Sequence, residues 1–367
     1  MKFATWFLTA SLVFSDIGAC HPNNTRTFTN PILQKEAADP WVFLYEDGLY
    51  YMILSANNGL ELLRSPRLTD WNNAESRTIF TPPPGTNYST DIWAPELHSI
   101  DDRWYVIFTA DPNNDSPIPE VDMLCDYNCP AVFHRMYVLE GSVSHPWEAE
   151  YTFKSQLDTY DQFAIDGTYF QHKSGLYHIY SCWINQYDAW PANLCITKMS
   201  NPWTVSSTLE ERQILSAPTK PWEKTPYNRT VNVRMSSNEA PQQLVNEKTG
   251  QQFIIYSAAR SDNRNYCLGQ LELVGDDPMD LSSWKKLEEG PVFYQNPEEE
   301  AFGVGHASFT KSPDETEDWI VYHGMRDPTF GWSARTIRAQ RFSWNYDGSP
   351  RFPRPGYGPY EAPSGQR

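Results

Sequence analysis

The chain repeats a short polar turn followed by a run of aromatic and aliphatic residues. Five such runs occur, at residues 48–56 (GLYYMILSA), 103–110 (RWYVIFTA), 175–183 (GLYHIYSCW), 250–258 (GQQFIIYSA) and 317–325 (EDWIVYHGM). The runs are rich in residues that favour strands, and the segments around them are rich in Gly, Pro, Asn, Asp and Ser, which favour turns. No stretch shows convincing helical periodicity. The pattern therefore predicts an all-β chain.

A second element alternates with the first, and it consists of a strand and a polar turn that ends in tryptophan. The five tryptophans are Trp71, Trp147, Trp203, Trp284 and Trp344. Two elements that each occur five times and strictly alternate predict a five-bladed β-propeller. The alternative is a β-sandwich in which the tryptophan spacing is accidental. We expect one propeller domain over residues 20–367, because all-β domains often reach this length as a single unit.

A third, shorter strand precedes each aromatic run. These strands begin in the segments ADPWV (38–42), WAPELH (93–98), IDGTYF (165–170), NEAPQQ (238–243) and GHASF (305–309). In a propeller, the first strand of every blade lines the central channel. The side chains predicted to converge at one end of the axis are therefore Asp39, Trp93, Asp166, Glu239 and His306.

Three convergent carboxylates indicate a functional site. Carboxylates repel one another and are costly to desolvate, so a fold gains no stability from bringing Asp39, Asp166 and Glu239 together. A metal site is the alternative to an active site. Cleavage of a glycosidic bond needs two carboxyl groups, one protonated to donate to the leaving oxygen and one ionised to activate water or attack the sugar. A third carboxylate can raise the pKa of the acid.

The charge and the N-terminus bear on partners and compartment. The formal net charge of −17 disfavours binding to nucleic acid. Residues 1–19 resemble a signal peptide, because Lys2 is followed by an apolar stretch and then by the small residues Gly18 and Ala19. No later segment is apolar over a length that would span a membrane. We expect a secreted, extracellular monomer with no nucleic-acid or membrane partner.

The cysteines and sequons fit the same compartment. The six cysteines are Cys20, Cys125, Cys129, Cys182, Cys195 and Cys267. In an oxidising compartment they are candidates for disulfides, and the sequence leaves the pairing open. Cys125 with Cys129 could close one loop, and Cys182 with Cys195 could tie one hairpin. Sequons for glycosylation begin at Asn23, Asn87, Asn114 and Asn228.

Taken together, the motifs resemble glycoside hydrolase family 43, whose members are five-bladed propeller enzymes acting on arabinans and xylans. The matching segments are ADPWV, DIWAPELH, AIDGTYF, SSNEAPQQL and the region 306–323. The resemblance implies that Asp39 is the general base and Glu239 the general acid, and that Asp166 orients Glu239 and raises its pKa. It also implies inversion of configuration, for which base and acid stand about 6.5–9.5 Å apart.

The resemblance further implies residues that bind the sugar. Arg335 matches a family arginine that reaches the catalytic carboxylates and a sugar hydroxyl, and Arg338 is the competing choice. Trp93 either stacks on the sugar or fills the core. Trp183 and Trp190 are weaker candidates for the pocket rim.

His306 matches a family histidine of the central channel, which often lies near a bound calcium. Either a structural calcium is bound near His306, or His306 is a buried histidine whose hydrogen bonds are made within the protein. No cofactor is required for the chemistry, and no residue is assigned as a metal ligand.

The motifs resemble most the exo-acting α-L-arabinofuranosidases that trim α-1,5-linked arabinan, so the expected substrate is a plant cell-wall polysaccharide or oligosaccharide. A β-xylosidase and an endo-arabinanase of the same fold are alternatives. The insert at 111–130 is long enough to block one end of a groove, as an exo enzyme requires. A non-catalytic sugar-binding propeller is the alternative of another class. Such a protein tends to repeat the same residues in every blade, whereas the axial residues here differ.

Overall fold

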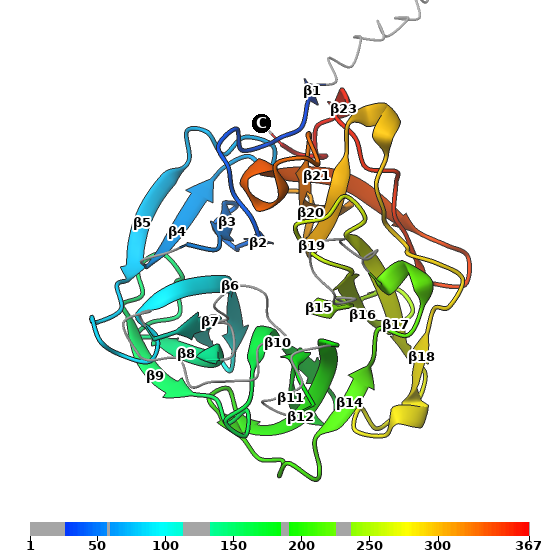
Figure 1. Cartoon of the computed structure of the whole chain (residues 1–367). Helices are drawn as coiled ribbons and strands as arrows, with labels where there is room; N and C mark the ends of the chain where they lie inside the picture. The colour runs from blue at the N-terminus through cyan, green and yellow to red at the C-terminus, as the bar shows by residue number, and fades with distance from the viewer. Residues whose placement is uncertain (1–25, 57–58, 113–132, 185–190, 225–235, 367) are drawn as a thin grey trace, which may run out of the picture.

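The protein is an all-β ring. The computed structural model describes residues 26–56, 59–112, 133–184, 191–224 and 236–366. In these residues five antiparallel sheets surround a common axis, the first and last strands form a sixth sheet of their own, and no α-helix occurs (Figure 1). The prediction of a five-bladed β-propeller is therefore confirmed. The signal peptide predicted for residues 1–19 lies outside the described residues.

The sheets follow one another along the chain, and in each of them the first strand lies nearest the axis (Figure 1). Blade 1 consists of β2 (Trp41–Leu44), β3 (Tyr50–Ile53), β4 (Leu60–Ser65) and β5 (Glu75–Phe80), and blade 2 of β6 (Thr90–Ile100), β7 (Arg103–Asp111), β8 (Arg135–Gly141) and β9 (Tyr151–Gln156). Blade 3 consists of β10 (Ala164–His172), β11 (Gly175–Cys182), β12 (Asn193–Asn201), β13 (Thr204–Val205) and β14 (Gln213–Ser216). Blade 4 consists of β15 (Asn238–Val245), β16 (Gln252–Ala258), β17 (Cys267–Leu273) and β18 (Trp284–Lys286), and blade 5 of β19 (Phe302–Lys311), β20 (Asp318–Met325), β21 (Arg335–Trp344) and β22 (Pro350–Arg351). Four short 3-10 helices also occur in the described residues: η2 (Pro221–Glu223), η3 (Leu281–Ser283), η4 (Pro297–Glu299) and η5 (Gly331–Ala334).

The five aromatic runs form the second strand of each blade, β3, β7, β11, β16 and β20. Successive residues of a strand point to opposite faces of its sheet, so each run can supply two cores. On β3, Tyr51 packs in a cluster shared with blade 2, whereas Tyr50 and Met52 pack in a cluster shared with blade 5. Each of the other large clusters likewise joins two neighbouring blades. The hydrophobic effect therefore holds the blades side by side around the axis.

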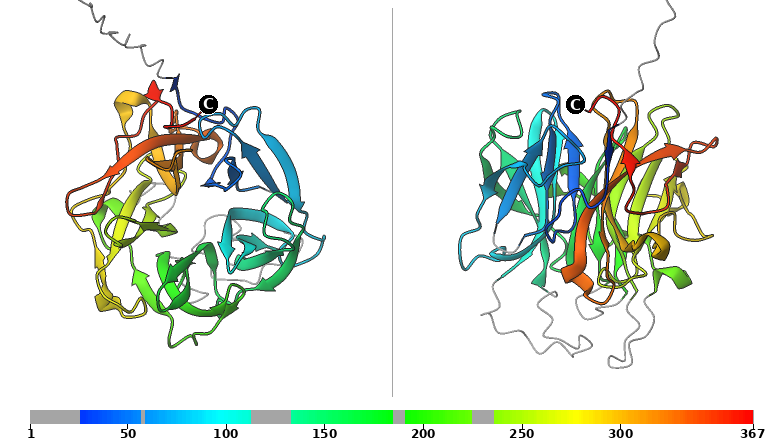
Figure 2. Two further views of the ribbon diagram at one scale, coloured as in Figure 1. Left: turned by 180° about the vertical axis from the view of Figure 1, so that it is seen from behind. Right: turned by 90° about the horizontal axis from the view of Figure 1, so that it is seen from above.

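The N-terminal segment closes the ring against the last blade. Strand β1 (Thr27–Phe28) pairs with β23 (Tyr360–Glu361), and Figure 2 shows that the first and last described segments meet at one edge of the ring. The backbone N–H of Ile32 donates to the carbonyl of Ile337 at 2.9 Å. The buried Asn30 side chain donates to the carbonyls of Ala339 and Gly356 and accepts from the N–H of Ala339.

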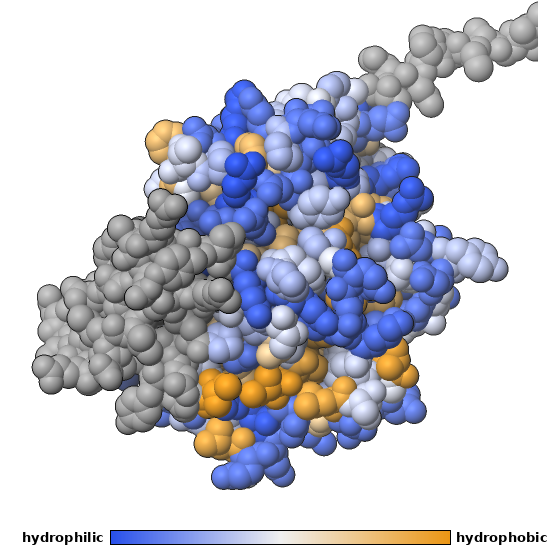
Figure 3. Space-filling model, turned by 45° about the vertical axis from the view of Figure 1, so that its right-hand side comes forward, coloured by the Kyte–Doolittle hydropathy of each residue, from blue (hydrophilic) through white to orange (hydrophobic). Residues whose placement is uncertain are grey.

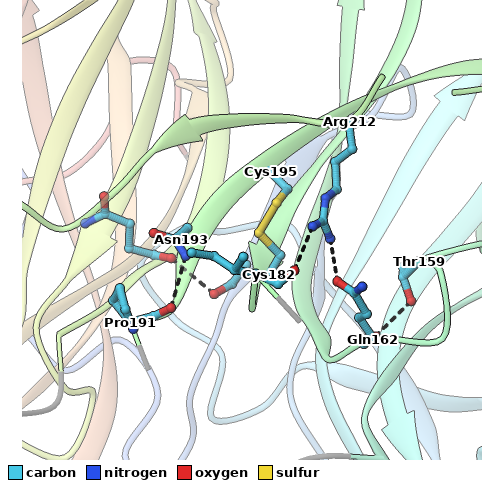
Figure 4. The surroundings of a disulfide bond; sticks show 10 residues. Thr159, Gln162, Cys182, Pro191, Asn193, Cys195 and Arg212 are labelled. Atoms are coloured by element: carbon cyan, nitrogen blue, oxygen red, sulfur yellow. Dashed lines mark hydrogen bonds between the residues drawn. A yellow bond between two sulfur atoms is a disulfide. The ribbon is translucent and has the colours of Figure 1, made fainter. Parts of the chain in front are cut away.

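A disulfide ties one hairpin of blade 3. Cys182 and Cys195 are bonded across β11 and β12, and both lie in the core cluster that blades 2 and 3 share (Figure 4). This is one of the two pairs considered in the sequence. Cys267 is free and buried, and Cys20, Cys125 and Cys129 lie outside the described residues.

One face of the molecule carries mainly polar side chains. The face shown in Figure 3 is largely hydrophilic, and hydrophobic residues appear in separate patches among the polar ones. Within the described residues, no helix has both the length and the apolar composition needed to cross a bilayer.

We predict that Asn30→Ala destabilises the fold by about 2–4 kcal/mol, because it leaves buried backbone groups of the ring closure without hydrogen bonds. Urea unfolding of the two proteins measures this difference. The control is Asn73→Ala, which changes an exposed asparagine of a turn and is expected to cost less than about 0.5 kcal/mol. Equal stability of the two variants would contradict the assigned role of Asn30.

Candidate active site

In or just before the first strand of every blade, a residue on the axial side of the sheet order adopts a left-handed backbone conformation, and in blade 2 Asp91 does so as well. The five residues, one from each blade, are Asp39 (φ 56°), Ala94 (φ 44°), Asp166 (φ 53°), Ala240 (φ 49°) and His306 (φ 47°). In blades 2 to 5 the pairing register between the first two strands shifts at the same place, which marks a β-bulge. Left-handed backbone costs a side chain about 1–3 kcal/mol, so the surrounding structure must hold each of these residues in place.

The sequence predicted which residue is equivalent in each blade, and in two blades the structure shifts that residue by one position. Asp39, Asp166 and His306 occupy the left-handed position itself. Trp93 and Glu239 instead come one residue before it, because Ala94 and Ala240 take the left-handed conformation in those blades. A bulge places two residues opposite one on the neighbouring strand, so a motif alignment by residue type cannot tell which of the two is equivalent.

A side chain of the preceding blade bonds to the backbone N–H of four of the five left-handed residues. Ser55 Oγ accepts from the N–H of Ala94 at 2.7 Å, and Thr109 Oγ1 accepts from that of Asp166 at 3.1 Å. Ser257 Oγ accepts from the N–H of His306 at 2.8 Å. His323 Nδ1 accepts from the N–H of Asp39 at 3.3 Å, which joins the last blade to the first. Neighbouring blades are thus joined at the level of the bulges.

Asp39 lies in a nearly enclosed positive environment. Its Oδ1 is 3.0 Å from His306 Nδ1 and 3.6 Å from a guanidinium nitrogen of Arg335. Ser55 Oγ donates to Oδ2 at 2.5 Å. Burial alone would raise the pKa of Asp39, but His306 and Arg335 hold it well below the usual range of an aspartate. Asp39 is therefore ionised at neutral pH.

Asp166 and Glu239 have the opposite electrostatic character. Burial, with the nearby charges of Glu239 and Asp39, raises the pKa of Asp166 to about 8. Burial also raises the pKa of Glu239, although Ser237 Oγ and Tyr266 OH each donate to its carboxylate at 2.7 Å. Two buried carboxyl groups that repel each other lose their protons in two steps that belong to the pair. The pair therefore retains a proton at neutral pH, while Asp39 does not.

His306 links the three carboxyl groups electrostatically. Burial lowers its pKa, but Asp39 and Asp166 outweigh burial and raise the pKa to about 9. The imidazole is consequently a cation at neutral pH. His323, buried behind it, has its pKa lowered to about 4 by burial and stays neutral. One charged and one neutral histidine therefore flank Asp39.

The structure separates the two candidate arginines. Arg335, which is partly exposed, reaches Asp39 as described above. Arg338 is fully buried, lies over the ring of Tyr357, and donates to the carbonyl of Glu300 at 3.4 Å. Arg335 is thus the arginine at the carboxylate cluster, and Arg338 is part of the core of blade 5.

The tryptophan candidates also differ in their positions. Trp93 is partly exposed and stacks on the imidazole of His134, with ring centroids 4.0 Å apart. Trp183 is buried and stacks on Phe163 at 4.2 Å, so it fills the core. Its assignment as a weaker candidate for the pocket rim was wrong, because its position at the end of an aromatic run also fits a core residue. Trp190 lies outside the described residues.

The protein groups around His306 do not fit a calcium ion. Calcium prefers six to eight oxygen ligands. The groups that surround Asp39 include two histidines and an arginine, and His306 is itself cationic. The structural calcium near His306 stays a prediction.

Several residues of the cluster were not identified from the sequence. The most important are Ser55, Ser257, Tyr266 and His323. A signal for three of them was present, because each aromatic run ends in Ser, Thr or His: ILSA, IFTA, IYSC, IYSA and VYHG. A polar residue repeated at the end of a hydrophobic strand indicates a hydrogen bond made at the same place in every blade. Tyr266 had no such signal.

Known proteins resemble this chain over most of its length. The family model described as "Glycosyl hydrolases family 43" matches residues 28–350. An "Extracellular exo-alpha-(1->5)-L-arabinofuranosidase" of Streptomyces avermitilis is 35% identical over 336 residues, which is 89% of this chain and 63% of that protein. "Alpha-L-arabinofuranosidase B" of Pyricularia oryzae is 30% identical over 334 residues, 88% of this chain and 62% of that protein. The chain thus spans less than two thirds of the length of these two relatives.

A solved structure resembles the whole ring. The crystal structure of α-L-arabinofuranosidase from Lactobacillus brevis superposes with a TM-score of 0.76 at 32% identity, covering 90% of this chain and 98% of that one. The fold, the family match and the identity of the relatives agree, and the chain belongs to glycosyl hydrolase family 43.

Proposed function

We propose that the protein is an inverting, exo-acting α-L-arabinofuranosidase that releases terminal arabinofuranose from α-1,5-linked arabinan and arabino-oligosaccharides of plant cell walls. One observation supports the chemistry above all others: an ionised carboxylate, Asp39, shares a cluster with a carboxyl pair that retains a proton. The names of the relatives from Streptomyces avermitilis and Lactobacillus brevis support the sugar.

In the proposed reaction, Asp39 takes a proton from a water molecule, whose oxygen attacks the anomeric carbon. Glu239 donates its proton to the glycosidic oxygen as the bond to the anomeric carbon breaks. Asp166 keeps the proton on Glu239 by repulsion, because a second negative charge beside it is unfavourable. His306 and Arg335 keep Asp39 ionised, and Tyr266 and Ser237 orient Glu239.

We also propose that residues 1–19 form a signal peptide and that the protein is secreted. The N-terminal pattern and the word "Extracellular" in the name of the Streptomyces avermitilis relative support this proposal. We further propose that the active unit is a monomer.

The sugar specificity is tested by product analysis. We expect arabinose as the sole product from debranched arabinan, because an exo enzyme removes one terminal unit at a time. Chromatography of the products over time distinguishes this outcome from a ladder of oligomers, which would identify an endo-arabinanase. Release of xylose from xylo-oligosaccharides would identify a β-xylosidase. Binding of the sugars without turnover would instead identify a sugar-binding propeller.

We predict that Asp39→Asn and Glu239→Gln each lower kcat on an aryl α-L-arabinofuranoside by about 10²–10⁴-fold, the range expected for loss of a general base or acid. The carboxyl-to-amide change is nearly isosteric, so circular dichroism should show an intact fold. Asp102→Asn is the matched control, because Asp102 is an exposed aspartate with left-handed backbone, φ 59°. Turnover near that of the control in either variant would refute its assigned role.

We predict opposite shifts of the pH profile for the two neighbours of Glu239. Asp166→Asn removes a repelling charge, so Glu239 loses its proton at lower pH and the alkaline limb of kcat moves to lower pH. Tyr266→Phe removes a donor to the ionised carboxylate, so the pKa of Glu239 rises and the alkaline limb moves to higher pH.

The measurement is kcat against pH for both variants and the wild type. Glu289→Gln, which changes an exposed carboxylate, is expected to leave the profile unchanged. A shift of both variants in the same direction would show that Glu239 is not the group titrating in the alkaline limb.

A further inference from the structure

A second cluster of titratable groups lies at one end of the β6–β7 hairpin, apart from the three carboxylates. Asp91 is at the start of β6, Asp111 at the end of β7, and His134 directly before β8. One ligand atom of each residue lies within 4.8 Å of those of the other two. In the part of the chain that the structure describes, these are the residues grouped closely enough to hold a metal ion.

Asp111 is buried without a partner that compensates its charge. Its side chain is fully inaccessible, and neither carboxylate oxygen makes a hydrogen bond within the described residues. The nearest cationic candidate is His134, whose Nδ1 is 3.6 Å from Oδ2, beyond hydrogen-bond distance. A buried carboxylate normally pairs with a cation or binds a metal, because its desolvation is otherwise uncompensated. Asp111 therefore indicates a ligand directed at this cluster.

The charges around Asp111 indicate that this ligand is a cation. Asp91 adds a second carboxylate, which has a ligand oxygen within 4.8 Å of the ligand atom of Asp111. Arg135, the neighbouring guanidinium, is directed to Asp161, to which it donates at 2.9 Å. Two carboxylates facing one another stay ionised together only when a positive group lies between them.

We propose that Asp91, Asp111 and His134 bind a divalent first-row transition ion, zinc or manganese. Two carboxylate oxygens and one imidazole nitrogen form a mixed set that suits these ions. Calcium is disfavoured because it prefers oxygen ligands throughout. Asp91 is partly exposed, so an ion can enter from solvent and keep a water ligand there.

A bound ion would fix the position of Trp93 beside the candidate active site, and it would take no part in the chemistry there. His134 stacks on Trp93 at 4.0 Å, so an ion that fixes the imidazole also fixes the indole. Thr109 lies two residues before Asp111 on β7 and accepts from the N–H of Asp166. The inference does not depend on the proposed reaction, because it rests on binding alone.

The test measures metal binding by the full chain. The protein is stripped with EDTA, desalted, and incubated with one equivalent of ZnCl₂, MnCl₂ or CaCl₂. After a second desalting, elemental analysis is expected to find about one zinc or manganese ion per chain. The melting temperature Tm in the presence of that ion is expected to rise by roughly 2–6 °C, since the ion binds the folded state.

Two variants locate the site. Asp111→Asn and Asp91→Asn are each expected to abolish the bound ion and the rise in Tm. Asp101→Asn is the matched control, because Asp101 is an exposed aspartate in the turn at the other end of the same hairpin. Asp91 is partly exposed, so its variant remains informative if Asp111→Asn does not fold. No retained zinc or manganese in the wild type, stabilisation by calcium alone, or undiminished binding in both variants would overturn the proposal.

Discussion

The contact between one blade's second strand and the next blade's bulge is the constraint on which the site depends. Asp39, Asp166 and His306 have left-handed backbone, which is unfavourable for side chains of this size. A hydroxyl or imidazole of the preceding blade accepts the backbone N–H of each of them. The functional side chains are thus placed by hydrogen bonds between blades, and the hydrophobic clusters between blades keep those acceptors in position.

The second constraint is electrostatic, and it explains how three similar groups acquire different protonation states. Asp39 lies against a cationic imidazole and a guanidinium, so it remains ionised in spite of burial. His306 also lowers the pKa of Asp166 and of Glu239, but burial outweighs it and raises the pKa of both groups. Environments that push the pKa values of neighbouring carboxyl groups apart are what acid–base catalysis at neutral pH requires.

The sequence was most informative where the repeat was strongest. The five aromatic runs predicted the second strands closely, since alternating hydrophobic residues bury both faces of a blade. The three carboxylates were brought together as predicted, whereas the placement of Trp93 and Glu239 was off by one residue because a bulge leaves no trace in residue type. Tyr266 was missed because no repeat marks it, and the Asp91–Asp111–His134 group was missed because, among the described residues, such a group occurs in blade 2 alone. Trp183 shows the limit of composition, because an aromatic residue suits a core and a pocket equally well.

The ring closure has a consequence for the order in which the protein matures. Asn30 bonds to Ala339, 309 residues away, and Asp39 obtains its charged neighbours from blade 5. A chain emerging from the ribosome or through a membrane would present Asp39 long before His306 and Arg335 exist to hold it. The charged environment that the proposed reaction needs around Asp39 would therefore form in one late step, when the final blade docks.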